Sequence, residues 1–179
     1  MELTVLTKEE WEQCRLCRNE NLSIWRTPYL LTKEMQEDSY NNMICNRKAN
    51  SRYWGVHEII QEGESDTFIG VVGLTDIFWE NRFAELSMML NINFNQQGLG
   101  TKALLRLLDK GFNELNLENI RGEAYTCSIT IDFWNKILER TGAYKTYLPN
   151  VKYWQSSYYQ SLYFNFTKKD FKNYVRSLQ

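Results

Sequence analysis

Hydrophobic positions alternate with polar ones in several segments of the chain and recur with a helical period in others. Alternation and short apolar runs predict strands, whereas stripes at a spacing of three to four residues predict helices. Thr7 followed by Glu10 forms a capping-box pattern that predicts a helix from residue 8. Strands are expected over 2–6, 51–60, 67–79, 83–92, 116–126, 144–154 and 158–166, and helices from 8, from 32, over 99–115, from 128 to 142 and over 167–179.

The order of these elements predicts an α/β fold. Three strands between residues 51 and 92 are joined by short polar turns, which favours an antiparallel meander. A strand–loop–helix–strand crossover follows over 83–126, so the sheet should be mixed but mostly antiparallel, with two N-terminal helices and a C-terminal strand pair. No linker divides the 179 residues, and the range 1–179 is expected to form a single domain.

Composition and charge exclude several classes of protein. The chain is 43% hydrophobic with a net charge of −1, which speaks against disorder and against a nucleic-acid or anionic-membrane partner. Apolar runs stay well short of a membrane span, and Met1–Glu2 does not open a secretory signal. A cytoplasmic protein is therefore expected.

The cysteines and the histidine give little sign of a metal site. Cys14 and Cys17 form one isolated C-x-x-C pattern in a helical segment, and a structural zinc site needs four ligands. The one histidine, His57, lies in a strand-like run and is better explained as an ordinary strand residue. No metal is expected.

The stretch FNQQGLGTK, residues 94–102, lies where a strand must become a helix. Gly98 and Gly100 allow the backbone to approach a ligand closely, and the first N–H groups of the helix lack intrahelical partners. Such a place suits a phosphate, but a plain turn with a helix cap is the alternative. The P-loop pattern is absent, and Ala103 stands where the dinucleotide fingerprint needs glycine.

Residues 95–101, NQQGLGT, resemble the [QR]-x-x-G-x-[GA] loop of the GCN5-related N-acetyltransferases (GNAT). The resemblance extends over roughly 50–166 and is strongest, in appearance, to the subgroup that modifies ribosomal-protein N-termini. It implies the GNAT fold, acetyl-CoA as acyl donor and a primary amine as acceptor, without a metal. The amine could belong to a small molecule, an amino sugar nucleotide or a protein.

The same resemblance implies which residues meet the cofactor. Loop amides would hold the pyrophosphate, and the end of the preceding strand would hydrogen-bond the pantetheine arm. Cys127 or Ser128 stands where the family often has an Asn, and Trp134 replaces a frequent Tyr whose hydroxyl protonates the thiolate. An indole has no acidic hydroxyl and cannot play that role. The expected cofactor-binding set is Met89, Leu90, Asn95, Gln96, Gln97, Gly98, Leu99, Gly100, Thr101, Cys127 and Trp134.

Glu85, within an apolar strand, is the first candidate for the general base. A carboxylate there could take a proton through water, and the resemblance implies the same role. The alternative is a strand carboxylate that faces solvent or pairs with Arg82 or Arg121. Glu123 on the neighbouring strand could face the same cleft. Catalytic hydroxyls for the departing thiolate are expected at Tyr125 and Ser128.

An aromatic-walled acceptor pocket is a further expectation, with core packing as the alternative. Its candidate residues are Trp25, Arg26, Tyr29, Tyr53, Trp54, Trp79, Tyr153 and Trp154. The leading function is an acetyl-CoA-dependent N-acetyltransferase. The alternative is a non-catalytic acyl-CoA-binding or protein-interaction module on the same fold, and a homodimer through an edge strand is one expected assembly.

Overall fold

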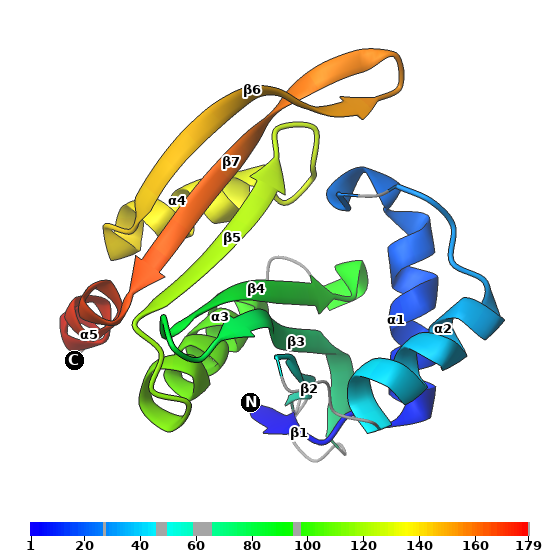
Figure 1. Cartoon of the computed structure of the whole chain (residues 1–179), viewed down its shortest axis with the longest axis horizontal. Helices are drawn as coiled ribbons and strands as arrows, with labels where there is room; N and C mark the ends of the chain where they lie inside the picture. The colour runs from blue at the N-terminus through cyan, green and yellow to red at the C-terminus, as the bar shows by residue number, and fades with distance from the viewer. Residues whose placement is uncertain (27, 46–49, 59–65, 95–97, 179) are drawn as a thin grey trace.

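The computed structural model describes residues 1–26, 28–45, 50–58, 66–94 and 98–178. The described residues form one seven-stranded sheet in the order β1-β2-β3-β4-β5-β7-β6 (Figure 1). The strands are β1 (Glu2–Thr4), β2 (Arg52–Glu58), β3 (Thr67–Phe78), β4 (Phe83–Leu90), β5 (Asn119–Tyr125), β6 (Tyr144–Trp154) and β7 (Ser157–Thr167). The α-helices are α1 (Lys8–Glu20), α2 (Lys33–Ser39), α3 (Leu99–Asp109), α4 (Ile131–Thr141) and α5 (Lys168–Ser177).

Local sequence signals set the helix ends. The Thr7 side chain accepts from the Glu10 N–H and the Glu10 carboxylate accepts from the Thr7 N–H, which confirms the capping box at the start of α1. Thr32 caps α2 as expected, and α2 runs into a π-helical turn, η2 (Tyr40–Cys45). Gly142 closes α4 at φ 65°, a left-handed conformation that favours glycine.

The sheet consists of two parts that meet at β4 and β5. Strands β2, β3 and β4 form the predicted antiparallel meander, and β5 pairs antiparallel with β7. The parallel β4–β5 ladder is short: it joins Phe83 to Asn119, Ala84 to Ile120 and Glu85 to Arg121, and then ends. Beyond Glu85 the two strands diverge, as the ribbons show (Figure 1).

Helices cover both faces of the sheet. α3 and α4 lie behind it in Figure 1, where Leu104 and Leu107 pack with Val72 in a continuous apolar core. On the opposite face, Trp11 of α1 packs with Val71 in a second cluster. Neighbouring strand residues point to opposite faces, which explains why Val71 and Val72 belong to different clusters. Each fully buried aliphatic side chain contributes about 1.5–3 kcal/mol to folding.

The segment 21–26 after α1 reaches across to the second part of the sheet. It contains the short turn η1 (Leu22–Ile24). The Ser23 carbonyl lies 3.9 Å from the Cys127 thiol, and the Trp25 carbonyl accepts a hydrogen bond from the amino group of Lys152 in β6. These contacts hold the segment beside the diverging ends of β4 and β5. None of the described helices combines the length and apolar character that a bilayer span requires.

Candidate functional site

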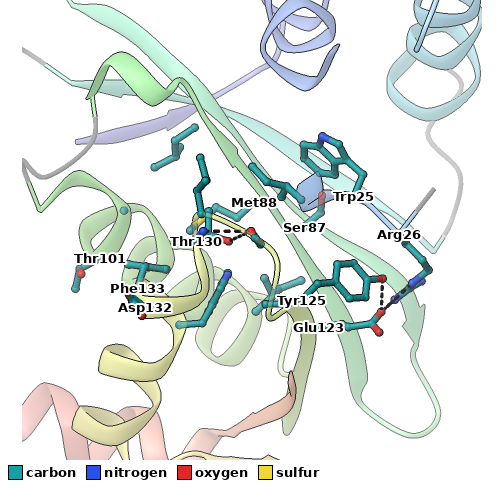
Figure 2. Close-up of a pocket in the computed structure, with 18 of the residues that line it drawn as sticks. Trp25, Arg26, Ser87, Met88, Thr101, Glu123, Tyr125, Thr130, Asp132 and Phe133 are labelled. Atoms are coloured by element: carbon teal, nitrogen blue, oxygen red, sulfur yellow. Dashed lines mark hydrogen bonds and ion pairs between the residues drawn. The ribbon is translucent and has the colours of Figure 1, made fainter. Parts of the chain in front are cut away.

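A cavity of about 740 Å³ occupies the space where β4 and β5 diverge. Consecutive residues of β4, Glu85 to Met88, all line it, as do Glu123 to Tyr125 of β5. Because consecutive strand residues point to opposite faces, the cavity passes through the sheet from one face to the other. Figure 2 shows Thr101, Asp132 and Phe133 at one end of it, and Trp25, Arg26 and Glu123 at the other.

The start of α3 forms one end of the cavity. Gly98 is the N-cap at φ 73°, and within the described residues no side chain caps this helix start. The N–H groups of the first helical turn, from Leu99 to Thr101, therefore keep their hydrogen-bonding capacity, at the positive end of the helix dipole. Gly98, Gly100 and Thr101 line the cavity, whereas the Leu99 side chain is buried in the core.

Gly100 serves packing as well as access. A Cβ at this position would lie 3.2 Å from the Phe133 ring of α4, closer than ordinary contact. The second glycine thus lets α3 approach α4 at the cavity wall. The remaining loop predictions, Asn95, Gln96 and Gln97, lie outside the described residues.

The end of β4 offers backbone groups to the cavity. Past Glu85 its β5-facing edge no longer pairs with β5, while its other edge stays paired with β3 up to Leu90. Leu90 lines the cavity. The Met89 side chain instead packs against the cluster around Trp11 on the other face, and its neighbour Met88 lines the cavity.

The connection between β5 and α4 supplies the facing wall. Ser128 lines the cavity, and its hydroxyl lies 2.8 Å from that of Thr130. Trp134 also lines the cavity. Its indole stacks on the Phe164 ring, with ring centroids 4.7 Å apart, and so packs against the sheet. Cys127 does not appear among the described lining residues, and burial raises the pKa of its thiol.

Arg26 joins two carboxylates at the other end of the cavity. Its Nη2 lies 3.0 Å from Glu85 Oε1 and 2.7 Å from Glu123 Oε2, and its Nε donates to Glu123 Oε2 at 2.9 Å. The partner of Glu85 is thus Arg26, and the expected alternatives Arg82 and Arg121 are wrong: Arg82 pairs with Glu118, and the Arg121 guanidinium lies over the Phe83 ring. Glu85 and Glu123 do face one cleft, as the sequence suggested.

Glu123 is the more deeply held carboxylate. Its side chain is 5% exposed, against 31% for Glu85. Burial acts to raise the pKa of Glu123, but hydrogen bonds from Ser161, Arg26 and Tyr163 and the Arg26 charge outweigh it, so the pKa is lowered. Glu123 therefore stays ionised at neutral pH and is a poor proton acceptor.

Tyr125 lines the cavity beside this carboxylate. Its hydroxyl donates to Glu123 Oε2 at 3.1 Å (Figure 2). Burial, followed by the negative charge of Glu123, raises the pKa of Tyr125 far above its ordinary value. The phenol thus keeps its proton at neutral pH.

The expectation of an aromatic-walled acceptor pocket is largely wrong. Among the rings proposed for it, Trp25 and Tyr53 line the cavity; the others do not, and Tyr29, Trp79 and Tyr153 are exposed. Indole and phenol rings in loops and hairpins cannot be assigned to a wall from sequence, because that depends on chain segments distant from them. His57 lies away from the cavity, between Glu10 and Asp66.

Several lining residues were not anticipated. Ser87 follows from strand alternation, because it shares the sheet face of Glu85. Thr130, Asp132 and Lys136 carry no sequence signal of their own. Within the described ranges, no three His, Cys, Asp or Glu side chains gather as metal ligands would.

Solved structures share this architecture. The spermidine N-acetyltransferase from Vibrio cholerae in complex with CoA and spermine matches with a TM-score of 0.80 and 19% identity, over 96% of this chain and 98% of that one. Mutant forms of the spermidine/spermine N-acetyltransferase SpeG from the same organism match with a TM-score of 0.77 and 19% identity, over 99% and 98% of the two chains. At this identity the likeness establishes the fold.

Sequence comparison adds the family. No curated protein matches the sequence. The family described as Acetyltransferase (GNAT) domain matches residues 1–127, which is more than half of the chain. These comparisons do not support the ribosomal-protein subgroup. The chain belongs to the GNAT acetyltransferase family.

Proposed function

We propose that this acetyltransferase moves the acetyl group of acetyl-CoA onto a primary amine inside the cavity between β4 and β5. The observation that carries the proposal is the cavity itself. It passes through the sheet, with a helix start that none of the described side chains caps at one end and the Glu85 carboxylate at the other. The helix start thus suits the diphosphate of CoA, and the Glu85 end of the cavity suits the amine.

The helix start is the proposed place for the pyrophosphate of CoA. The N–H groups of Leu99, Gly100 and Thr101 are free of intrahelical bonds, and phosphate suits the helix dipole. The free edge of β4 beyond Glu85 offers backbone groups to the pantetheine amides. Bound there, acetyl-CoA supplies the thioester whose carbonyl carbon is attacked.

Glu85 is the proposed general base. The incoming amine must reach the thioester unprotonated, so its ammonium proton passes to Glu85, directly or through water. The C–N bond then forms and the C–S bond breaks. The thiolate takes a proton from a donor in the site, and the second proton lost by the nitrogen returns to that donor through solvent. Tyr125, whose side chain lines the cavity, is the proposed donor, with Ser128 as the second candidate.

The acceptor class is open to a direct test. The similar solved proteins are named for spermidine and spermine, which makes polyamines one arm of an amine panel. Amino sugars, amino acids and peptide N-termini, including those of ribosomal proteins, are the other arms. A cytoplasmic location and a homodimer through an edge strand of the sheet also belong to this proposal, and size measurement in solution tests the dimer.

The test has two stages. A thermal-shift series with acetyl-CoA, CoA and longer acyl-CoAs measures cofactor binding, and thiol release in the presence of each amine measures transfer. Stabilisation by acetyl-CoA together with amine-dependent thiol release supports the proposal. Tight acetyl-CoA binding without release over the whole panel would favour the non-catalytic module instead, and no binding at all would refute both.

A further inference from the structure

Two carboxylates lie at the acceptor end of the cavity. The hydrogen-bond acceptors of Glu123 are largely occupied, whereas those of Glu85 are only partly occupied. Glu123 Oε2 accepts from Arg26 and from the Tyr125 hydroxyl, and Glu123 Oε1 accepts from the Ser161 hydroxyl at 2.5 Å. An ionised carboxylate has about four acceptor positions. Glu123 therefore has little capacity left for a substrate ammonium.

Glu85 keeps acceptor capacity. Its contact with Arg26 engages Oε1, and in the part of the chain that the structure describes Oε2 makes no hydrogen bond. The side chain is 31% exposed and lines the cavity. One ammonium group of an acceptor can thus be held and deprotonated at Glu85.

Arg26 lines the cavity and keeps unused donors. Its bonds to the two carboxylates engage Nε and Nη2, and its guanidinium also interacts with the Tyr125 side chain. A guanidinium has five N–H donors, and this side chain is 59% exposed while lining the cavity. The contacts with Glu85, Glu123 and Tyr125 use at most four of these five donors, so at least one remains for a ligand, within a few ångströms of Glu85.

We infer that Arg26 determines acceptor specificity: the favoured acceptor carries a carboxylate or phosphate a few bonds from its amine. The amine goes to Glu85, and the anionic group takes the free guanidinium donors, a pairing that is charge-assisted and directional. This inference rests on the proposed acetyl transfer. It names the acceptor class of the same site.

The same geometry disfavours polyamines. A second ammonium on the acceptor would meet the positive charge of Arg26, and the buried Lys152 adds a second positive charge beside the Tyr125 ring. The two carboxylates at this end are both already paired with Arg26. Although the similar solved proteins are spermidine acetyltransferases, the inference places this chain apart from them in acceptor charge.

A series of acceptors of equal reach tests the sign of the charge preference. The amines are 5-aminopentanoate, 1-aminopentane and 1,5-diaminopentane, whose distal ends are anionic, apolar and cationic, and 4-aminobutylphosphonate separates phosphate-like from carboxylate recognition. For the native protein we expect kcat/KM to be about tenfold higher for the anionic amines than for 1-aminopentane, with the diamine lowest. Spermidine serves as the polyamine reference.

Variants assign the preference to Arg26. Arg26→Gln should reduce the ratio of anionic amine to diamine by about tenfold or more, whereas Arg26→Lys should keep part of it, because it keeps the charge but loses the fork of donors. Arg82→Gln, which removes an arginine paired with Glu118 outside the cavity, should leave the ratio unchanged. Unchanged affinity for acetyl-CoA would show that the Arg26 variants are folded.

The outcomes separate the inference from the function. Turnover that favours spermidine or the diamine, or a ratio that Arg26→Gln does not alter, would overturn the inference and leave acetyl transfer standing. Should no amine be turned over, calorimetry on the CoA-loaded protein replaces kinetics. Binding in the expected order would then support the inference while the transfer proposal falls, and no binding of the anionic amines would overturn the inference as well.

Discussion

The amino group of Lys152 in β6 donates a hydrogen bond to the main-chain carbonyl of Trp25, which lies just after η1. Lys152 is 4% exposed, and its ammonium group lies 4.5 Å from the centroid of the Tyr125 ring. Burial lowers the pKa of this amine. The contact fixes the segment that carries Arg26 against the hairpin of β6 and β7.

Lys152→Met should loosen that segment while it keeps the apolar stem of the side chain. Loss of the hydrogen bond to Trp25 removes about 1 kcal/mol of restraint, so we expect KM for the acceptor amine to rise about threefold to tenfold. Acetyl-CoA affinity should stay near the native value. Steady-state kinetics and amide hydrogen exchange over residues 21–26 measure both effects. Exchange as slow as in the native protein would contradict this role.

Gly98→Asp should weaken acetyl-CoA binding at least about tenfold, because it adds a negative charge beside the proposed phosphate position. Gly98→Asn is the matched control. Both side chains tolerate the left-handed conformation at φ 73°, and no described atom beyond the chain neighbours lies within 4 Å of a Cβ placed there. Calorimetric titration of the two variants isolates the charge. Equal affinities for the Asp and Asn variants would argue against a diphosphate at this helix start.

Glu85→Gln should lower kcat about 100-fold or more while acetyl-CoA affinity changes little, since a general base typically contributes that much. The amide keeps an oxygen that accepts from Arg26, so the geometry is retained. Glu118→Gln, a surface carboxylate paired with Arg82, should have native kinetics. Single-turnover rates would report the chemical step. Native rates in Glu85→Gln would remove this residue from the mechanism.

Glu123 should make folding stability depend on acidity. Its pKa is lower in the folded than in the unfolded chain, so its contribution is fully present above the ordinary glutamate pKa and is lost as the pH falls through the folded value. In Glu123→Gln, the free energy of unfolding should therefore decline less steeply below about pH 4.5. Denaturant titrations from pH 7 to pH 3 measure the slope. Ser161→Ala, which removes one donor to Glu123, should flatten it partly, and identical slopes in all three proteins would refute the assignment.

Most of the fold could be predicted from sequence because its signals are local. Thr7 with Glu10 fixes one helix start, Gly142 fixes one helix end, and alternation marks the strands of the meander. The length of the β4–β5 ladder could not be predicted from such signals. It depends on contacts between segments that are far apart in the sequence, which no single segment encodes.

The site was predictable in part for the same reason. Gly98 and Glu85 stand in recognisable local patterns, and both line the cavity. The link between Arg26 and Glu123 joins residues 97 positions apart, and the sequence placed Arg26 only in an aromatic loop. The sequence could not show that the Met88 side chain lines the cavity while the Met89 side chain packs on the other face, because that depends on the strand register.

The opening that passes through the sheet has a consequence for the order of events in turnover. Donor and acceptor can enter from opposite sides of the molecule, so neither has to leave before the other arrives. Both can be bound at the same time, so the acyl group can pass directly from donor to acceptor without a covalent acyl-enzyme intermediate. Initial-rate plots should accordingly show intersecting rather than parallel lines.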